Sequence, residues 1–491
     1  MNVEQADPRR WRVLGVCLTA LALTLLDATV VNVALPSIGR SLHAAPSQLQ
    51  WVVSGYVLAF GLVPIIGGRL GDDRGRRRML LIAVAGFAGS SLLVGLAPTA
   101  GVLVAGRLLQ GVAGGLVNPQ VSGVLQQLFR GDERGRAFGL LGATVGLATA
   151  LGPVVGGLVI GLVGPDWGWR ATFLLNVPIS IVSFLLIARW LPRRAPTPAT
   201  DPTRARLDLP GVGLLAAGLF ALLFPPVQFD SSHNPRLALI WLPAIGLLVG
   251  FAWWERGPAR RRGQPLIDTG LFAIRSYTAG LLLALLYFTA YTGLPLVLSL
   301  YLQDGLGRSP LTSGLTASAY AIGAGIAAPI AGRFVARLGR RLIVGALVVF
   351  TAGTLALAVV VLTTGVVSAG VLPLVLAGPL LLAGLGGGAV ITPNQALSLA
   401  RIDTRGGSTA GGMLQTSQRV GAAIGAATLS AVFFAMLSPG PRTRADYDGA
   451  FATSLFVTAG VAAVALIVAV VDARAEHAQR RAGGLRSALS D

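Results

Sequence analysis

The sequence predicts an all-α integral membrane protein, in which two six-helix bundles and two inserted helices make fourteen transmembrane helices. Three observations predict this fold class. Only 12% of the 491 residues are charged and 54% are hydrophobic, whereas a soluble protein carries roughly 25% charged residues. Apolar runs of about 20 residues, the length that crosses a bilayer, recur along the whole chain. A loop pattern of the first half also returns in the second half.

The apolar runs set the positions of the helices. The first run follows a basic segment, as in a signal peptide, but it continues for about 24 residues, which is too long for one, so we expect it to stay as a membrane helix. The predicted spans are 13–37, 50–70, 79–97, 101–127, 137–161, 169–191, 209–225, 237–254, 277–302, 311–334, 341–362, 369–397, 409–436 and 449–471.

The arginines set the orientation. If the N-terminus is placed inside the cell, the segments between spans put 31 arginines inside and six outside, and Arg107 and Arg419 fall within spans. Cytoplasmic loops of membrane proteins carry the excess of basic residues. Both termini are therefore predicted to be cytoplasmic.

The basic and ligating residues exclude several functions. All 39 basic residues are arginine, and the formal net charge is +19. They form short clusters between apolar runs, which argues against a nucleic-acid partner. Without lysine there is no GxxxxGK[ST] phosphate-binding loop for ATP-driven export. The single Cys17 and three scattered histidines form no metal-ligand pattern. We expect no cofactor, no bound metal and no enzymatic activity.

An internal repeat predicts the domain organisation. The segment 68–77 (GRLGDDRGRR) returns as 332–341 (GRFVARLGRR), so that spans one to six match spans nine to fourteen. Two parallel halves with a site between them are typical of secondary transporters. The predicted parts are an N-terminal six-helix bundle (1–191), a cytoplasmic linker with two extra transmembrane helices (about 209–225 and 237–254) and a second basic loop (192–275), a C-terminal six-helix bundle (276–471) and a cytoplasmic tail (472–491).

The loop 68–80 (GRLGDDRGRRRML) resembles the signature GxLaDrxGrkxxl of the major facilitator superfamily. Asp73 departs from the signature, which has a basic residue there, and Ala336 replaces the acid in the second copy. Asp72 can pair with an arginine near a helix N-terminus and lock two helices on the cytoplasmic side. The alternative is a merely tight turn. We expect the neighbouring arginines to substitute for one another. The residues assigned to this gate are Gly68, Asp72, Gly75, Arg76 and Arg77.

Span five resembles the antiporter motif gx8Gx3GPx2GG of the same superfamily, with Ala148 in place of the middle glycine. Glycines at this spacing let helices approach closely, and a proline bends the helix. The resemblance covers residues 13–471 and points to the fourteen-span drug:proton antiporter branch (the EmrB/QacA group). It implies the major facilitator fold, a bacterial inner (plasma) membrane location and a conformational role for Gly152, Pro153, Gly156 and Gly157.

Asp27 is the only carboxylate well inside a predicted span, and the segment 26–36 (LDATVVNVALP) resembles a motif of that branch. An aspartate at mid-membrane costs about 2.5–3.5 kcal/mol to insert. Its carboxyl group can take up and release a proton as its surroundings alternate between dry and wet. We therefore assign Asp27 to proton coupling. The alternative is a structural aspartate that stays paired or caps a broken helix.

Arg107 and Gln110 in span four resemble the family pattern lxxxRxxqG. Arginine cannot lose its proton, so Arg107 is expected to favour proton release from a nearby carboxylate or to hold an anion. The alternative for both Arg107 and Arg419 is a structural role, in which backbone carbonyl groups accept the hydrogen bonds of the guanidinium group. Aromatic faces suit lipophilic or cationic ligands. The candidate substrate contacts are Asn32, Tyr56, Gln110, Asn118, Tyr287, Tyr291, Gln415 and Arg419.

These features predict a proton-coupled antiporter that exports small amphipathic or lipophilic compounds by alternating access, as in multidrug efflux and antibiotic resistance. The expected partners are a lipophilic or cationic small molecule, protons and the lipid bilayer, and we expect a monomer. One alternative is a dedicated exporter of one natural product, lipid or amino acid. Another is a non-transporting membrane sensor or scaffold, but Asp27 together with the GP and GG pairs of span five favours transport.

Overall fold

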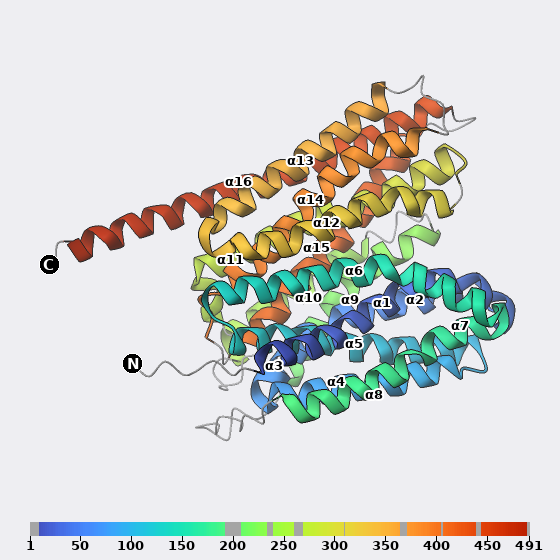
Figure 1. Ribbon diagram of the computed structural model, residues 1–491, viewed down its shortest axis with the longest axis horizontal. Helices are drawn as coiled ribbons and strands as arrows, with labels where there is room; N and C mark the ends of the chain where they lie inside the picture. The colour runs from blue at the N-terminus through green and yellow to red at the C-terminus, as the bar shows by residue number, and fades with distance from the viewer. Residues whose placement is uncertain are drawn as a thin grey trace. The chain divides into compact units, whose positions relative to one another are not determined.

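The computed structural model of the chain describes residues 9–191, 208–232, 239–259, 269–308, 310–363, 371–403, 406–437 and 443–488. Within these ranges the chain forms helices joined by short connections and no strand (Figure 1). The helices of the first half are α1 (Arg10–Leu42), α2 (Pro46–Leu62), α3 (Pro64–Arg74), α4 (Arg76–Gly95), α5 (Ala100–Leu128), α6 (Gly131–Val163), α7 (Pro165–Leu174) and α8 (Asn176–Trp190).

The second half contains eight more α-helices in the described ranges. They are α9 (Leu209–Ser232), α10 (Trp241–Trp254), α11 (Arg275–Leu300), α12 (Pro310–Leu338), α13 (Arg340–Thr363), α14 (Leu372–Ser398), α15 (Gly407–Ala435) and α16 (Arg444–Ala488). Three short helical turns, η3 (Glu255–Ala259), η4 (Thr269–Ala273) and η5 (Tyr301–Gly305), adjoin them.

Each predicted span coincides with one helix or with a broken pair of helices. In the described residues, ten helices are long and apolar enough to cross a membrane, and twelve if two bent pairs each count as one span. The two inserted helices, α9 and α10, are shorter: the apolar part of α9 is Pro210–Pro225, and α10 has 14 residues. The all-helical membrane fold is confirmed, and the count of fourteen spans stays a prediction.

Three predicted spans depart from a single straight helix. The α2 and α3 helices meet at an angle of 46° because Pro64 begins α3, and a proline lacks the N–H that a continuous helix would use. The α7 and α8 helices are separated at Leu175. The α6 helix bends by 42° between Thr149 and Val154.

The helices are grouped into two compact units. Unit 1 comprises residues 1–130, 144–271 and 402–416, and unit 2 comprises residues 131–143, 272–401 and 417–491. Two helices therefore contribute to both units. The first residues of α6 pack in unit 2, where Gly139 lies against Gly332 of α12. The first residues of α15 pack in unit 1, where Gly412 lies against the backbone of Pro64.

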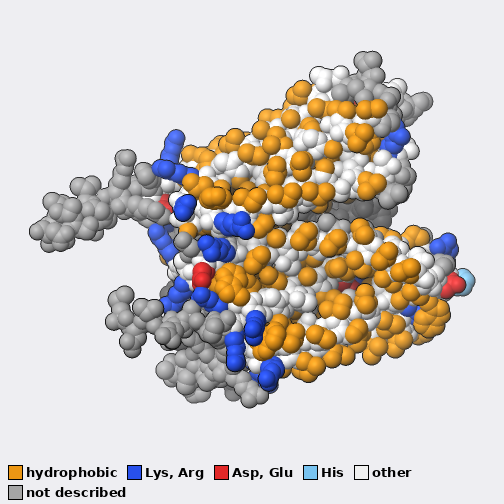
Figure 2. Space-filling view, viewed as in Figure 1, with side chains coloured by type: hydrophobic (Ala, Val, Ile, Leu, Met, Phe, Trp, Pro, Cys, Tyr) orange, Lys and Arg blue, Asp and Glu red, His pale blue; other side chains and the backbone are white. Residues whose placement is uncertain are grey.

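Each unit is packed inside and apolar outside. The core of unit 1 includes Val31, Trp169 and Phe173. The core of unit 2 is built around residues such as Leu294 and Phe350. Figure 2 shows apolar side chains over the outer faces of the helices and arginines gathered near helix ends. Apolar side chains in contact with the surroundings are what a lipid environment requires of a helix.

Candidate functional site

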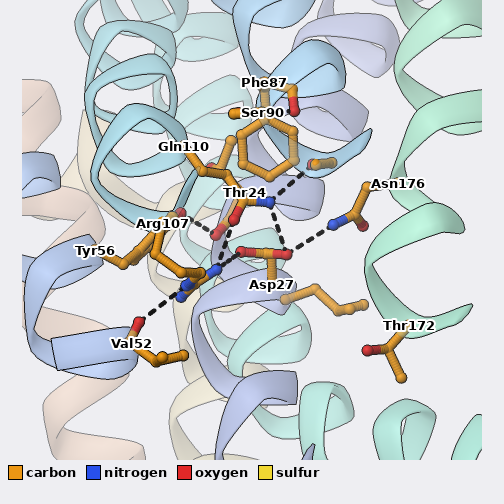
Figure 3. Close-up of polar contacts among 12 residues, drawn as sticks. Thr24, Asp27, Val52, Tyr56, Phe87, Ser90, Arg107, Gln110, Thr172 and Asn176 are labelled. Atoms are coloured by element: carbon orange, nitrogen blue, oxygen red, sulfur yellow. Dashed lines mark hydrogen bonds and ion pairs between the residues drawn. The ribbon is translucent and has the colours of Figure 1, made fainter. Parts of the chain in front are cut away.

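Asp27 lies on α1 in the middle of unit 1 and is almost completely buried (2% exposed). Three side chains from two other helices donate hydrogen bonds to its carboxylate (Figure 3). Arg107 Nη1 lies 2.5 Å from Oδ2, while Gln110 Nε2 and Asn176 Nδ2 lie 3.0 and 2.7 Å from Oδ1. The structure therefore joins α1, α5 and α8 at one carboxylate.

Arg107 is fully buried and is held on several sides. Its Nε donates to the carbonyl oxygen of Val52 at 3.0 Å, and Nη1 also donates to Gln110 Oε1 at 2.7 Å. The guanidinium lies over the ring of Tyr56, with 4.2 Å to the ring centroid. A charge can be buried at this depth because it is paired and hydrogen-bonded.

The local sequence explains why these groups meet. Arg107 and Gln110 are three residues apart, so they lie on one face of α5. Gly111, one residue further, lets the backbone of α2 approach so closely that a Cβ atom there would collide with Tyr56. That approach brings the Val52 carbonyl within reach of Arg107. The Tyr56 hydroxyl in turn donates to the Thr24 carbonyl of α1 at 2.7 Å.

The network suits an ionised carboxylate. All three groups that contact the oxygens of Asp27 are donors, and Gln110 Nε2 also donates to Ser91 Oγ at 2.8 Å. A protonated Asp27 would need an acceptor in place of one donor. The amide of Asn176 can supply one by turning its oxygen toward the carboxyl group. Proton uptake would thus be accompanied by a rearrangement at the first residue of α8.

The glycines of the predicted antiporter motif divide into two kinds. Gly152 and Gly156 of α6 face α1, where added Cβ atoms would meet Thr29 and Val30. Thr29 and Val30 follow Asp27 closely on α1. The α6 helix therefore packs against the helix that carries the carboxylate. Gly157 has no atom within 4 Å of an added Cβ. The side chains of Pro153 and Asn32 lie outside the described part of the structure.

Asp72 forms a second polar cluster in unit 1. Its Oδ1 accepts from Arg76 Nη2 at 2.7 Å and from the backbone N–H of Ser408 at 3.1 Å. Its Oδ2 accepts from the backbone N–H and the hydroxyl of Thr409 at 2.8 and 2.9 Å. Asp72 therefore caps the N-terminus of α15, where free N–H groups and the helix dipole favour a carboxylate.

The arginines that follow Asp72 have different partners. Arg76 is buried and also donates from Nη1 to the Gly123 carbonyl at 2.6 Å. Arg77 donates to the Ala188 carbonyl at the end of α8. The two arginines therefore make different contacts, which argues against the expectation that they substitute for one another; transport by single variants tests it. Gly75 has φ +96°, a conformation that glycine adopts readily, and Gly68 packs on the backbone of Ser408.

The candidate substrate residues are divided between the two units. Tyr56 and Gln110 belong to the Asp27 network of unit 1. In unit 2 the rings of Tyr287 and Tyr291 lie tilted against each other with 5.2 Å between their centroids, and the ring of Tyr320 lies 4.9 Å from that of Tyr291. The Tyr287 hydroxyl is buried without a hydrogen-bond partner among the described residues.

The remaining candidates are amide and arginine side chains. The Asn118 amide oxygen and both amide atoms of Gln415 are buried without partners in the described ranges. Arg419 is half-buried on α15 and has a partner. Buried unsatisfied amides are costly and invite a ligand or an ordered water.

Asn176 is a site residue that the sequence reading missed. It interrupts an otherwise apolar run in span six, and an amide in a membrane helix needs a hydrogen-bond partner. That interruption was the available signal. The pairing of Asn176 with Asp27 joins positions 149 residues apart, and no local pattern predicts such a contact.

Comparison with known proteins gives a consistent result. The family model described as Major Facilitator Superfamily matches residues 17–255 and 280–491. The chain is 37% identical over 444 residues to the probable actinorhodin transporter of Streptomyces coelicolor, covering 90% of this chain and 75% of that protein. It is 34% identical over 486 residues to a puromycin resistance protein of Streptomyces alboniger, covering 96% and 93% of the two chains.

A solved structure shows the same fold. The human organic anion transporter superposes with a TM-score of 0.65 at 18% sequence identity, and the match covers 94% of this chain and all of that one. At this identity the likeness concerns the fold alone. Ten to twelve apolar helices and this match together describe a membrane transporter fold.

Proposed function

Because the chain belongs to the major facilitator superfamily, a family of membrane transporters and not of enzymes, we propose that it exports small lipophilic or amphipathic compounds in exchange for protons. Relatives carry names that refer to actinorhodin, puromycin and multidrug resistance, which supports drug or antibiotic efflux. Each proton that enters the cell releases about 2.3 kcal/mol of free energy per 100 mV of membrane potential. No cofactor, nucleic-acid partner or second subunit is needed for this cycle.

The observation that carries the proposal is the buried Asp27–Arg107 pair. A proton carrier must change charge during the cycle, and Arg107 cannot. The three donors would hold Asp27 as an ionised carboxylate, and protonation would break this arrangement. The rearrangement would act on α5 and α8 directly and on α6 through its packing against α1. Protonation is thereby coupled to helix packing, as alternating access requires.

Asp72 supplies the proposed cytoplasmic gate. Its hydrogen bonds hold the first turn of α15 in unit 1, while later residues of α15 belong to unit 2. Release of these bonds would free the N-terminus of α15. This gate would bias the equilibrium between the two conformations without touching the substrate. Its place on the cytoplasmic side depends on the positive-inside orientation with cytoplasmic termini, which is part of the proposal.

Efflux from everted membrane vesicles tests the proposed function. Vesicles that contain the protein should accumulate a fluorescent lipophilic cation when respiration acidifies their interior, and a proton uncoupler should stop this uptake.

Asp27→Asn keeps the size of the side chain and fixes it as neutral, so it should abolish coupled uptake in a folded, inserted protein. Substrate-induced proton release from wild-type protein in detergent should disappear in the same variant. If Asp27→Asn releases as many protons as the wild type, Asp27 is not the proton-coupling residue.

A dedicated exporter is the second candidate function. Two relatives are named after a single compound, actinorhodin and puromycin. Transport of one compound from a panel of dyes and antibiotics would favour this function, whereas transport of several unrelated compounds would favour multidrug efflux. A sensor or scaffold would transport none of them.

A further inference from the structure

A small polar cavity in unit 2 lies outside both clusters described above. It measures about 70 Å³ and opens where the start of α11, the start of α13, the residues after α14 and the helix α16 meet. This volume holds several waters or one group of similar size. Its polar lining consists of Arg275, Ser276, Arg340, Arg401, Asp472 and Glu476.

Arg340 anchors one wall of the cavity. It occupies the repeat position of Arg76, but Ala336 stands where the first copy has Asp72. Its acidic partners come instead from α16: Nη1 pairs with Asp472, and Nε lies 3.1 Å from Glu476 Oε2. Arg340 is buried to 7% exposure. Both carboxylates of the lining therefore pair with this arginine.

The rest of the lining has donors and no acceptor to match them. Three guanidinium groups and two carboxylates leave one positive charge in excess. Among the described residues, neither Arg275 nor Arg401 forms an ion pair. A ligand with a negative charge would therefore be favoured beside these two guanidinium groups.

We infer that this cavity binds a phosphoryl oxyanion. A phosphate group matches the planar guanidinium donors of Arg275 and Arg401. A single negative charge would also neutralise the excess charge of the lining. The phosphoryl group can come from free phosphate or from the headgroup of an anionic phospholipid. The bound anion would join α11 to the residues that follow α14.

Thermal unfolding of the purified full-length protein tests the site. In neutral detergent, replacement of chloride by inorganic phosphate at constant ionic strength should raise Tm of the wild type by a few degrees in a saturable way, because a ligand that binds only the folded state stabilises it. A parallel series compares phosphatidylglycerol vesicles with phosphatidylcholine vesicles. A response to phosphate identifies the free anion as a ligand, and a response to phosphatidylglycerol alone identifies the lipid headgroup.

Two variants and one control separate binding from general charge effects. Arg401→Gln, at an exposed position, should lose the response. Arg275→Gln should also lose it, because this variant removes the other guanidinium that would hold the anion. Arg337→Gln removes an exposed arginine of α12 outside the cavity and should respond like the wild type. Equal responses of wild type and Arg401→Gln in both series, or no response of the wild type in either, would overturn the inference.

Discussion

Around Asp27, the donors fit one protonation state of the carboxylate and oppose the other. Arg107 cannot turn into an acceptor, whereas the amides of Gln110 and Asn176 can rotate. Of these two, Gln110 is fixed by three hydrogen bonds, to Asp27, Arg107 and Ser91. Among the described residues, the Asn176 side chain makes one hydrogen bond, to Asp27. We therefore expect Asn176 to be the group that changes orientation when the proton arrives.

Asn176→Ala should raise the pH at which substrate-induced proton release is half-maximal. The ionised carboxylate loses a hydrogen bond of about 1.5–3 kcal/mol, which corresponds to about one to two pH units. The matched control is Ser180→Ala, which removes a buried hydroxyl one turn further along α8. The two variants should differ in the pH profile at similar folded yield. Coinciding profiles of Asn176→Ala and wild type would show that Asn176 has only a packing role.

Arg76 and Arg77 offer a second comparison at the residue scale. Arg76→Gln leaves Asp72 without its buried ion-pair partner, a loss of about 3–5 kcal/mol in such pairs, and should strongly lower transport and Tm. Arg77→Gln loses a bond to the Ala188 carbonyl and should keep most of the activity. Vesicle uptake rates normalised to protein amount provide the measurement. Equal losses in the two variants would favour a general charge requirement of this loop.

At the scale of helices, close packing of α6 on α1 depends on single glycines. In Gly152→Ala the added methyl group meets Thr29 Oγ1 and the Leu26 carbonyl, and overpacking of this kind costs about 1–3 kcal/mol. We expect a lower Tm and slower transport. Gly157→Ala adds the same atom five residues later, where no neighbour lies within 4 Å. This second variant should behave like the wild type, and a similar defect in both would point to backbone flexibility instead of packing.

The positions of the helices could be predicted from the sequence, because an apolar run of bilayer length has few other solutions. The partners of polar residues could not. Asn176 meets Asp27, and Arg340 meets Asp472, only after helices distant in the chain have packed. The repeat identified Arg340 as the counterpart of Arg76, but nothing in its own loop indicated that α16 supplies the acid. The tail after residue 471 looked merely polar, yet α16 continues through it to Ala488.

For the whole molecule, the proposed orientation rests on the arginine distribution and can be tested with two fusions. A reporter placed after Ser232, at the end of α9, should report the outside. A reporter after Arg262, which lies outside the described residues, should report the cytoplasm, because the predicted topology has α10 cross the membrane between the two sites. Alkaline phosphatase and a fluorescent protein are complementary reporters for the two sides. The same side for both sites would mean that α9 and α10 do not form a transmembrane hairpin.

The cap that Asp72 places on α15 also has a consequence for exchange with solvent. The backbone N–H groups of Ser408 and Thr409 are bound to a carboxylate 336 and 337 positions earlier in the chain, whereas first-turn amides of a helix usually face water. Their deuterium uptake should therefore be slow while the cap holds and fast once it is released. These two amides record the state of the cytoplasmic gate in unmodified protein, with no label attached and no residue replaced.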